Sequence, residues 1–231
     1  EDASHAIGGS YLDKPIGSCI YSDITVFSFH PVKIITTGEG GMCVTNSPFL
    51  AESMVLNRSH GITRDPQRMS KEPDGPWYYE QIGLGLNYRM TDFQAALGCS
   101  QIKRLDAYVE SRHKINSLYS QALSKLPIKL PYQDPNCYSA FHLYVIRLNL
   151  SEINSSHRQV FESLREAGIG VNLHYIPVYR QPFYQKMGYI PSNFPNSESY
   201  YQEAISLPMY PALTLREINH IHDSLENALN G

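Results

Sequence analysis

The stretch Ser28-Phe29-His30-Pro31-Val32-Lys33-Ile34-Ile35-Thr36-Thr37-Gly38-Glu39-Gly40-Gly41-Met42 decides how this chain is interpreted. Its single lysine follows an apolar, β-branched run that starts at Ile24, and it precedes a glycine turn and a second apolar run that ends at Thr45. This pattern predicts Lys33 on a loop between two strands, where a rigid scaffold can hold a side chain over a pocket. A lysine amine held away from water loses its proton readily and forms a Schiff base with an aldehyde.

An aspartate stands upstream of this lysine, in the segment Glu1-Asp2-Ala3-Ser4-His5-Ala6. An Asp paired with a Schiff-base lysine is the combination that a pyridoxal phosphate (PLP) enzyme needs. Taken alone, Lys33 would be an ordinary exposed loop lysine and Asp2 a capping residue of a turn or helix. The two residues together with the glycine turn favour the catalytic interpretation.

A fourth motif, Gly85-Leu86-Asn87-Tyr88-Arg89-Met90, completes a set. The chain resembles the DegT/DnrJ/EryC1/StrS family of sugar aminotransferases, whose pattern is E-D-A-x-[QH]-A, S-F-x-x-x-K, G-E-G-G and G-x-N-Y-R-[ML]. All of these motifs are present, and the resemblance runs from Glu1 to the end of the chain. It implies the type I PLP-dependent aminotransferase fold in the α/β class, with the C-terminal part of the large domain followed by a small α/β C-terminal domain.

The resemblance implies a role for each motif residue. Lys33 would hold PLP and move a proton, and Asp2 would keep the pyridine nitrogen protonated. Ser28 would contact the cofactor phosphate, and His5 would lie near the ring. Asn87 would reach the phosphate of the neighbouring subunit, which makes the protein a homodimer with shared active sites. From the residues alone, His5 is equally a packing residue and Asn87 a turn residue beside glycines.

The segment from Asn172 to Tyr184 resembles the pseudaminic acid branch of the family. In the family a His at position 174 faces the sugar, so the resemblance implies substrate contacts by His174 and Tyr175. Relatives often have a second His where this chain has Tyr179. The implied reaction transfers an amino group from glutamate to C4 of a UDP-linked 4-keto-6-deoxy sugar with an acetamido group. The lysine at position 33 argues against the related sugar dehydratases, which have His there.

Composition excludes several other classes of protein. The chain has 231 residues, with 19 basic and 22 acidic side chains and a net charge of -3. No basic stripe predicts nucleic-acid binding, and no apolar run is long enough to predict a membrane span. The nine histidines form no HxxxH or HExxH motif, which argues against a metal hydrolase. Four widely spaced cysteines without a CxxC motif predict reduced, buried thiols and a cytoplasmic protein.

Periodicity and turn signals predict two domains, residues 1–110 as the C-terminal part of the PLP-binding large domain and residues 111–231 as the small domain. A long helix over about 91–126 would link them. The other expected elements are strands at 23–30, 41–45, 138–150 and 170–175, a helix over about 46–58, a loop over 63–86, and helices starting at the capping boxes of Ser156 and Thr214.

The chain opens inside a functional motif, at Glu1. If the resemblance holds, roughly the first two-fifths of a two-domain enzyme of the usual size would be absent. A rival interpretation is therefore a non-catalytic protein, either a truncated paralogue or a fragment that acts as a binding or assembly module. The visible absorption band of PLP bound to Lys33 would distinguish the two.

Overall fold

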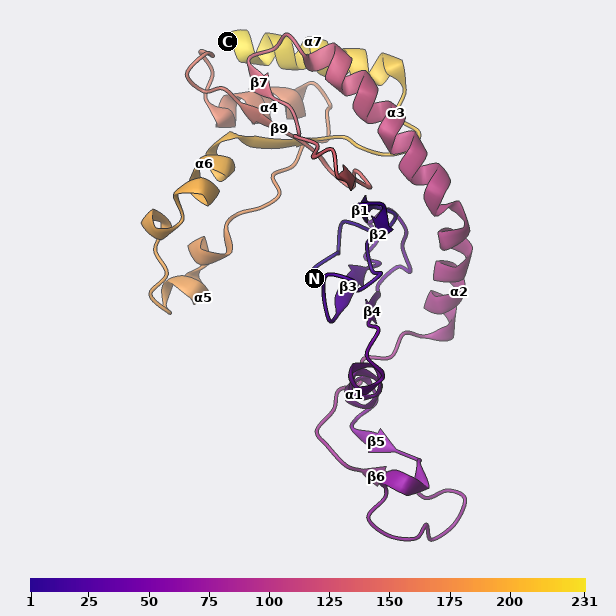
Figure 1. The fold of residues 1–231 in the computed structure, drawn as a ribbon. Coiled ribbons are helices and arrows are strands. Elements are labelled where there is room, and N and C mark those ends of the chain that lie inside the picture. The colour runs from indigo at the N-terminus through magenta and orange to yellow at the C-terminus, as the bar shows by residue number, and fades with distance from the viewer. The chain divides into compact units, whose positions relative to one another are not determined.

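The computed structural model describes residues 1–231, which divide into two compact units (Figure 1). Unit 1 contains residues 1–106 and 136–140, and unit 2 contains residues 107–135 and 141–231. The chain first passes from unit 1 to unit 2 within helix α3 (Leu105–Leu123). No helix is long and apolar enough to cross a membrane.

Unit 1 is built from short antiparallel pairs of strands and two α-helices. The sheets are β2-β1-β8, β3-β4 and β5-β6. The elements are β1 (Ser10–Tyr11), β2 (Lys14–Pro15), β3 (Thr25–Ser28), β4 (Gly41–Val44), α1 (Pro48–Arg58), β5 (Ile62–Thr63), the 3₁₀ turn η1 (Pro66–Arg68), β6 (Glu80–Gln81), α2 (Asp92–Gln101), the 3₁₀ turn η2 (Ile102–Arg104) and β8 (Cys137–Tyr138).

The β3–β4 hairpin confirms the two strands expected around the lysine, with shorter bounds than the sequence indicated. Along β3, Thr25 and Phe27 are buried whereas Val26 is 39% exposed, so one face of the hairpin packs inward and the other is open. The loop that follows is anchored by two buried residues, Ile34 and Ile35. The hairpin is therefore a fixed base for the loop that carries Lys33.

Helix α1 begins as the sequence predicts, with Ser47 as the N-cap and proline in the first turn. Neither α1 nor α2 buries any of its residues in this chain. Phe49 is 77% exposed and Phe93 is 91% exposed. The apolar side chains that predicted these helices thus do not contribute to a core within this chain.

The single helix expected over about 91–126 is wrong in two respects. The 3₁₀ turn η2 separates α2 from α3, and α3 ends at Leu123. The apolar residues of the pattern also differ in burial: Val109 and Ile115 of α3 are buried, whereas Leu97 of α2 is 40% exposed. Only the part of the pattern in α3 packs against a core, so the periodicity alone could not show where the helix would break.

The segment over 63–86, expected to be a loop without secondary structure, is better ordered than that. It carries η1 and the β5–β6 pairing. The Glu80 carboxylate accepts hydrogen bonds from the Ser70 backbone N–H at 2.7 Å and from its hydroxyl at 3.0 Å. This contact ties the loop across ten residues and holds Ser70 beside β6.

Unit 2 is an antiparallel sheet of order β10-β9-β7 packed with helices. Its elements are α3, β7 (Ile128–Lys129), β9 (Tyr144–Leu148), α4 (His157–Glu166), the 3₁₀ turn η3 (Val178–Arg180), α5 (Pro182–Gln185), the 3₁₀ turn η4 (Pro191–Asn193), α6 (Pro195–Glu203), β10 (Ala204–Leu207) and α7 (Leu215–Asn230). The capping boxes predicted at Ser156 and Thr214 are both present at the starts of α4 and α7.

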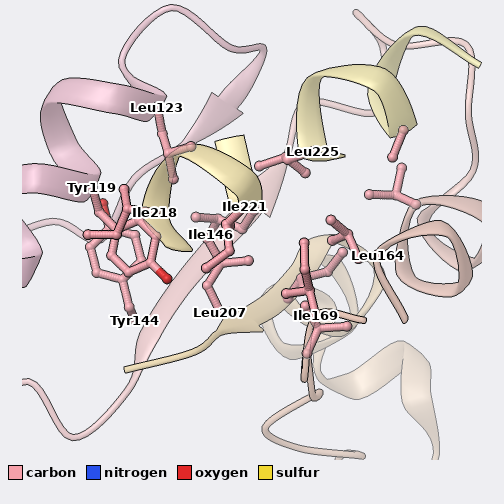
Figure 2. Packing of buried hydrophobic residues seen from close by; sticks show 14 of the residues in the cluster. Tyr119, Leu123, Tyr144, Ile146, Leu164, Ile169, Leu207, Ile218, Ile221 and Leu225 are labelled. Carbon is pink, nitrogen blue, oxygen red and sulfur yellow. The ribbon is translucent and has the colours of Figure 1, made fainter. Parts of the chain in front are cut away.

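The core of unit 2 lies between the sheet and helices α3, α4 and α7 (Figure 2). Tyr144 and Ile146 of β9 are fully buried, as strict alternation along a half-covered strand requires. The Tyr144 ring stacks on Tyr119 of α3 with centroids 4.6 Å apart. Leu164 of α4 and Leu225 of α7 are also fully buried, so each of these helices is held by its apolar face.

Two expected strands of this region are wrong. The run 138–150 splits into β8 and β9, and between them Phe141 takes a backbone φ of 46°, in the left-handed region that interrupts an extended chain. The run 170–175 forms only an isolated bridge between Asn172 and Ser206. There the Asn172 side chain accepts a hydrogen bond from the Leu173 N–H at 2.8 Å, in place of a ladder partner.

Candidate active site

The loop between β3 and β4 is closed by its own hydrogen bonds. The Phe29 carbonyl accepts from the Thr37 N–H and from the Thr36 hydroxyl, both at 3.0 Å. Glycine is required at two points of the turn. Gly38 has a φ of 80°, and a Cβ on Gly41 would lie 2.8 Å from the Phe27 carbonyl oxygen. These hydrogen bonds and glycines therefore fix the backbone conformation of the loop.

Lys33 lies within this closed loop, at the position that the sequence predicts. Its backbone N–H donates to the His30 carbonyl at 3.0 Å, and its side chain is half-buried. Partial burial lowers the pKa of the Lys33 amine, and the negative charge of Asp2 opposes this shift. The amine thus loses its proton more readily than an exposed lysine would.

Asp2 is held beside β3 by backbone hydrogen bonds. The Ala3 N–H donates to the Val26 carbonyl and the Val26 N–H donates to the Glu1 carbonyl, both at 2.9 Å, and Asp2 itself bridges Val26 in parallel. Figure 1 shows the N-terminus next to β3. Residues 1–3 therefore run alongside β3 and are joined to it by a single parallel bridge.

The Asp2 carboxylate caps a turn, which is one of the two roles weighed from the sequence. Its Oδ1 accepts from the Ser4 N–H at 3.0 Å and from the Ser4 hydroxyl at 2.6 Å, which is a turn cap. These hydrogen bonds, helped by the positive charges of His5 and Lys33, lower the pKa of Asp2. The carboxylate is therefore firmly ionised and lies within electrostatic reach of Lys33.

The open face of the hairpin fits a flat, charged cofactor. Bridged partners point to the same side of a sheet, so Asp2 and Val26 share a face, and Ser28 shares it because it lies two residues further along β3. Along this face the ionised carboxylate of Asp2 comes first, then the exposed apolar side chain of Val26, and then the half-buried hydroxyl of Ser28. Lys33 follows on the loop that leaves the same strand. A pyridine ring with a charged nitrogen and a phosphate matches this order of groups.

His5 and Ser28 are also placed near this face. His5 is half-buried and acts electrostatically on Asp2. The Ser28 hydroxyl accepts from the His30 N–H at 3.4 Å, a long hydrogen bond that a phosphate oxygen could replace.

Asn87 is exposed and has no interaction with Lys33, Asp2 or Ser28. Its segment is docked on the end of α1, where Leu86 donates to the Asn57 carbonyl at 2.7 Å and Tyr88 donates to the Arg58 carbonyl at 3.0 Å. The backbone on both sides of Asn87 is thus fixed, and its side chain is left in solvent.

His174 and Tyr175 lie in unit 2. The Nδ1 atom of His174 is 2.7 Å from the Ser206 hydroxyl. The rings of His174 and Tyr175 meet edge to face, with their centroids 4.7 Å apart. Tyr175 is 60% exposed. It lines an open hollow of about 410 Å³ together with Ile176, Pro177, Val178, Tyr179, Asn196, Ser197 and Tyr200.

Tyr179 of this hollow is held by Glu198, Arg180 and Phe194, three residues to which the sequence analysis gave no role. Glu198 accepts from the Tyr179 hydroxyl and from the Arg180 Nε, each at 2.8 Å. These contacts, led by the Arg180 hydrogen bond, lower the pKa of Glu198 to about 2. The Tyr179 ring also stacks on Phe194 at 4.2 Å. Tyr179 therefore builds the wall of the hollow, a role that no local sequence pattern indicates.

The cysteines differ from expectation. All four are free, as predicted, but Cys43, Cys99 and Cys137 are exposed and only Cys19 is partly buried. The expectation of buried thiols was wrong because it rested on spacing, whereas exposure depends on the strand or helix face on which each cysteine falls. No group of three or more metal-binding side chains is present.

A family model described as the DegT/DnrJ/EryC1/StrS aminotransferase family matches residues 1–226. The chain belongs to this family. Its four motifs were thus correctly recognised in the sequence, and the aminotransferases of this family depend on PLP.

One curated relative is the UDP-4-amino-4,6-dideoxy-N-acetyl-beta-L-altrosamine transaminase of Campylobacter jejuni subsp. jejuni serotype O:23/36. It is 38% identical over 234 residues, which cover 99% of this chain and 58% of that protein. The chain therefore spans little more than half the length of such relatives.

Two solved structures show the fold. Helicobacter pylori PseC, an aminotransferase involved in the biosynthesis of pseudoaminic acid, matches with a TM-score of 0.88 at 31% identity, over 99% of this chain and 58% of that one. Spr1654 of Streptococcus pneumoniae in its PMP form matches with a TM-score of 0.87 at 26% identity, over 98% and 56%. It has also been solved in a PLP form. The expected type I PLP-dependent aminotransferase fold is confirmed.

Proposed function

We propose that this chain belongs to a nucleotide-sugar aminotransferase, which transfers an amino group from glutamate to C4 of a UDP-linked 4-keto-6-deoxy acetamido sugar. The observation that carries the proposal is the half-buried Lys33 on a closed loop beside the ionised Asp2. The transaminase named for the Campylobacter relative and the pathway named for PseC support the class of sugar.

Residues 1–110 would then belong to the PLP-binding large domain and residues 111–231 to the small domain. The division of the chain into two compact units within α3 supports this boundary. The free cysteines suit a reducing compartment such as the cytoplasm.

When bound, PLP supplies the electron-withdrawing ring that stabilises negative charge on the carbon next to the transferred nitrogen. Lys33 would anchor the cofactor through its amine and move the proton at that carbon, for which a lowered pKa suits it. Asp2 would hold the proton on the pyridine nitrogen, because a neighbouring negative charge favours the protonated form. In a homodimer with shared active sites, Ser28 and Asn87 of the partner subunit would donate hydrogen bonds to phosphate oxygens, and His5 would lie at the ring.

His174 and Tyr175 would contact the sugar. The hollow beside Tyr175 combines tyrosine rings with the amide of Asn196 and the hydroxyl of Ser197. Aromatic rings together with hydrogen-bonding groups suit a sugar that carries an acetamido group.

The first test is spectroscopic. The complete polypeptide, mixed with PLP, should show a visible absorption band. Reduction with borohydride should attach the cofactor covalently to the tryptic peptide that contains Lys33, which serves as a label. Glutamate together with a UDP-4-keto-6-deoxy acetamido sugar should then yield the amino sugar by mass spectrometry. A label that maps elsewhere, or a lack of any amino product with a panel of nucleotide keto sugars, would contradict the proposal.

Asp2→Asn is expected to slow transamination about tenfold while PLP still binds. The amide oxygen can still accept from Ser4, so the turn should survive, but the charge that favours a protonated ring nitrogen is lost, and such a charge shifts a pKa by roughly 1–3 units. Steady-state turnover and the spectrum of the bound cofactor are the measurements. Asp23→Asn, at an exposed position, is the matched control. Unchanged turnover in Asp2→Asn would show that Asp2 is only a cap.

A further inference from the structure

Ser206 is a buried hydroxyl in an otherwise apolar strand. It lies in β10, whose residues are all buried, and its side chain is only 4% exposed. Its neighbours Ile205 and Leu207 belong to the core of unit 2, so alternation directs Ser206 to the opposite side of the strand. A hydroxyl buried there without a partner would destabilise the fold, because it loses its hydrogen bonds to water and gains none in return.

The segment that covers Ser206 is the one that carries His174. The Asn172 N–H donates to the Ser206 carbonyl at 3.2 Å, and the Ser206 N–H donates to the Asn172 carbonyl at 2.8 Å. Two residues further along, the Ser206 hydroxyl meets Nδ1 of His174 at 2.7 Å. One residue of β10 thus fixes both the backbone and the ring of this segment.

The chemistry of this contact selects one form of the imidazole. A serine hydroxyl has one hydrogen to donate, and a neutral imidazole offers one acceptor nitrogen. Nδ1 of His174 is the one side-chain acceptor that the Ser206 hydroxyl reaches. If Nδ1 carried the proton instead, the hydroxyl hydrogen would be buried without an acceptor. The favoured arrangement has the hydroxyl donating to Nδ1, which leaves the ring proton on Nε2.

We infer that Ser206 is a positioning residue for His174, which contacts the keto sugar in the proposed function, and that the Ser206 hydroxyl holds the imidazole in its Nε2–H tautomer. The inference rests on the proposed function for the identity of the substrate. The tautomer itself follows from the contact between β10 and the 172–174 segment. The Tyr175 ring, edge to face with His174, adds a second restraint on the orientation of the imidazole.

The first experiment measures the tautomer. Nitrogen-15 histidine spectra of the complete polypeptide at neutral pH would be assigned with His174→Gln, and the pattern of two-bond couplings reports which nitrogen carries the proton. The wild type should show His174 as Nε2–H, and Ser206→Ala should show a mixture of tautomers. Ser199→Ala, which removes a partly buried hydroxyl of α6 that bonds Glu203, should leave the pattern unchanged. A wild-type His174 protonated on Nδ1, or an unchanged pattern in Ser206→Ala, overturns the inference.

The second experiment separates the two half-reactions. Conversion of PLP by glutamate alone should proceed at the wild-type rate in Ser206→Ala, whereas the step with the keto sugar should slow about two- to tenfold, the value of a neutral hydrogen bond of roughly 0.5–1.5 kcal/mol. Adding Ser206→Ala to His174→Gln should not slow the step with the keto sugar any further. Equal slowing of both half-reactions would mean a merely structural role.

Two safeguards keep the outcomes distinct. If Ser206→Ala does not fold, Ser206→Cys keeps nearly the same volume with a weaker donor, and it should show a partial loss of the Nε2–H form. If the wild type aminates no keto sugar, the proposed function fails, and the tautomer measurement still decides whether Ser206 sets the state of His174.

Discussion

Replacing Lys33 by alanine is expected to lower turnover about 10²–10⁴-fold, the usual contribution of a positioned proton-transfer group. The amine is half-buried with a pKa that burial lowers, and Asp2 lies within its electrostatic reach. In the proposed reaction Lys33 also anchors the cofactor. No other lysine of the chain combines a closed loop with these surroundings, so no neighbour should replace it.

The fold should tolerate this substitution. Ile34 and Ile35 anchor the loop in the core of unit 1, and its hydrogen bonds come from the backbone and from Thr36. The Lys33 side chain makes no ion pair at short range. Thermal unfolding followed by circular dichroism should therefore change little, which separates a catalytic loss from unfolding.

Two further variants give this experiment its controls. Lys33→Arg keeps a positive charge, but an arginine cannot lose its proton in a protein, so it should be as inactive as Lys33→Ala. Lys14→Ala removes an exposed lysine from β2 and should retain full activity. Turnover near the wild-type level in Lys33→Ala would exclude the mechanism proposed for this site.

The parts of the site that sequence alone could predict are local. Apolar runs on both sides of a glycine turn indicate a strand, a loop and a second strand, and the β3–β4 hairpin confirms this with Lys33 on the loop. The capping boxes at Ser156 and Thr214 are equally local, because a hydroxyl and an amide or carboxylate three residues later satisfy each other's backbone groups. Such signals need no knowledge of the rest of the fold.

The parts that sequence missed depend on distant contacts. The hydrogen bond between His174 and Ser206 joins residues that are 32 positions apart in the sequence, and the hydrogen bond from Tyr179 to Glu198 joins residues that are 19 positions apart. The only local signal for Ser206 was a lone hydroxyl among apolar residues of a buried strand. The break at Phe141 had none, because a left-handed φ at a phenylalanine is a property of its packing and not of its type.

Asn87→Ala is expected to weaken PLP affinity about 10- to 100-fold. A hydrogen bond to a charged group contributes about 1.5–3 kcal/mol, and each 1.4 kcal/mol or so is a factor of ten in affinity. Asn87 is exposed and touches none of Lys33, Asp2 and Ser28 in its own chain, while the backbone around it is held on the end of α1. A fixed amide that faces solvent is suited to reach a partner subunit.

Asn57→Ala is the matched control for the affinity measurement. Asn57 is exposed on the adjoining end of α1, and its side chain donates only within its own helix region, to Ser53. Its loss should leave PLP affinity unchanged, as measured by titration of the visible absorption band. An equal loss of affinity in both variants would point to a general loosening of this segment and not to a phosphate contact.

Mixing Lys33→Ala with Asn87→Ala should restore activity if the pockets are shared between subunits. In a heterodimer of the two variants, one pocket combines the intact Lys33 of one chain with the intact Asn87 of the other, and the second pocket carries both defects. Activity should therefore rise well above that of either variant at limiting PLP, with the complete polypeptide used for both. If subunit exchange is demonstrated by mass spectrometry and the mixture gains nothing, then Asn87 serves the pocket of its own chain or no pocket at all. That result would remove the homodimer with shared sites from the proposal while leaving the roles of Lys33 and Asp2 intact.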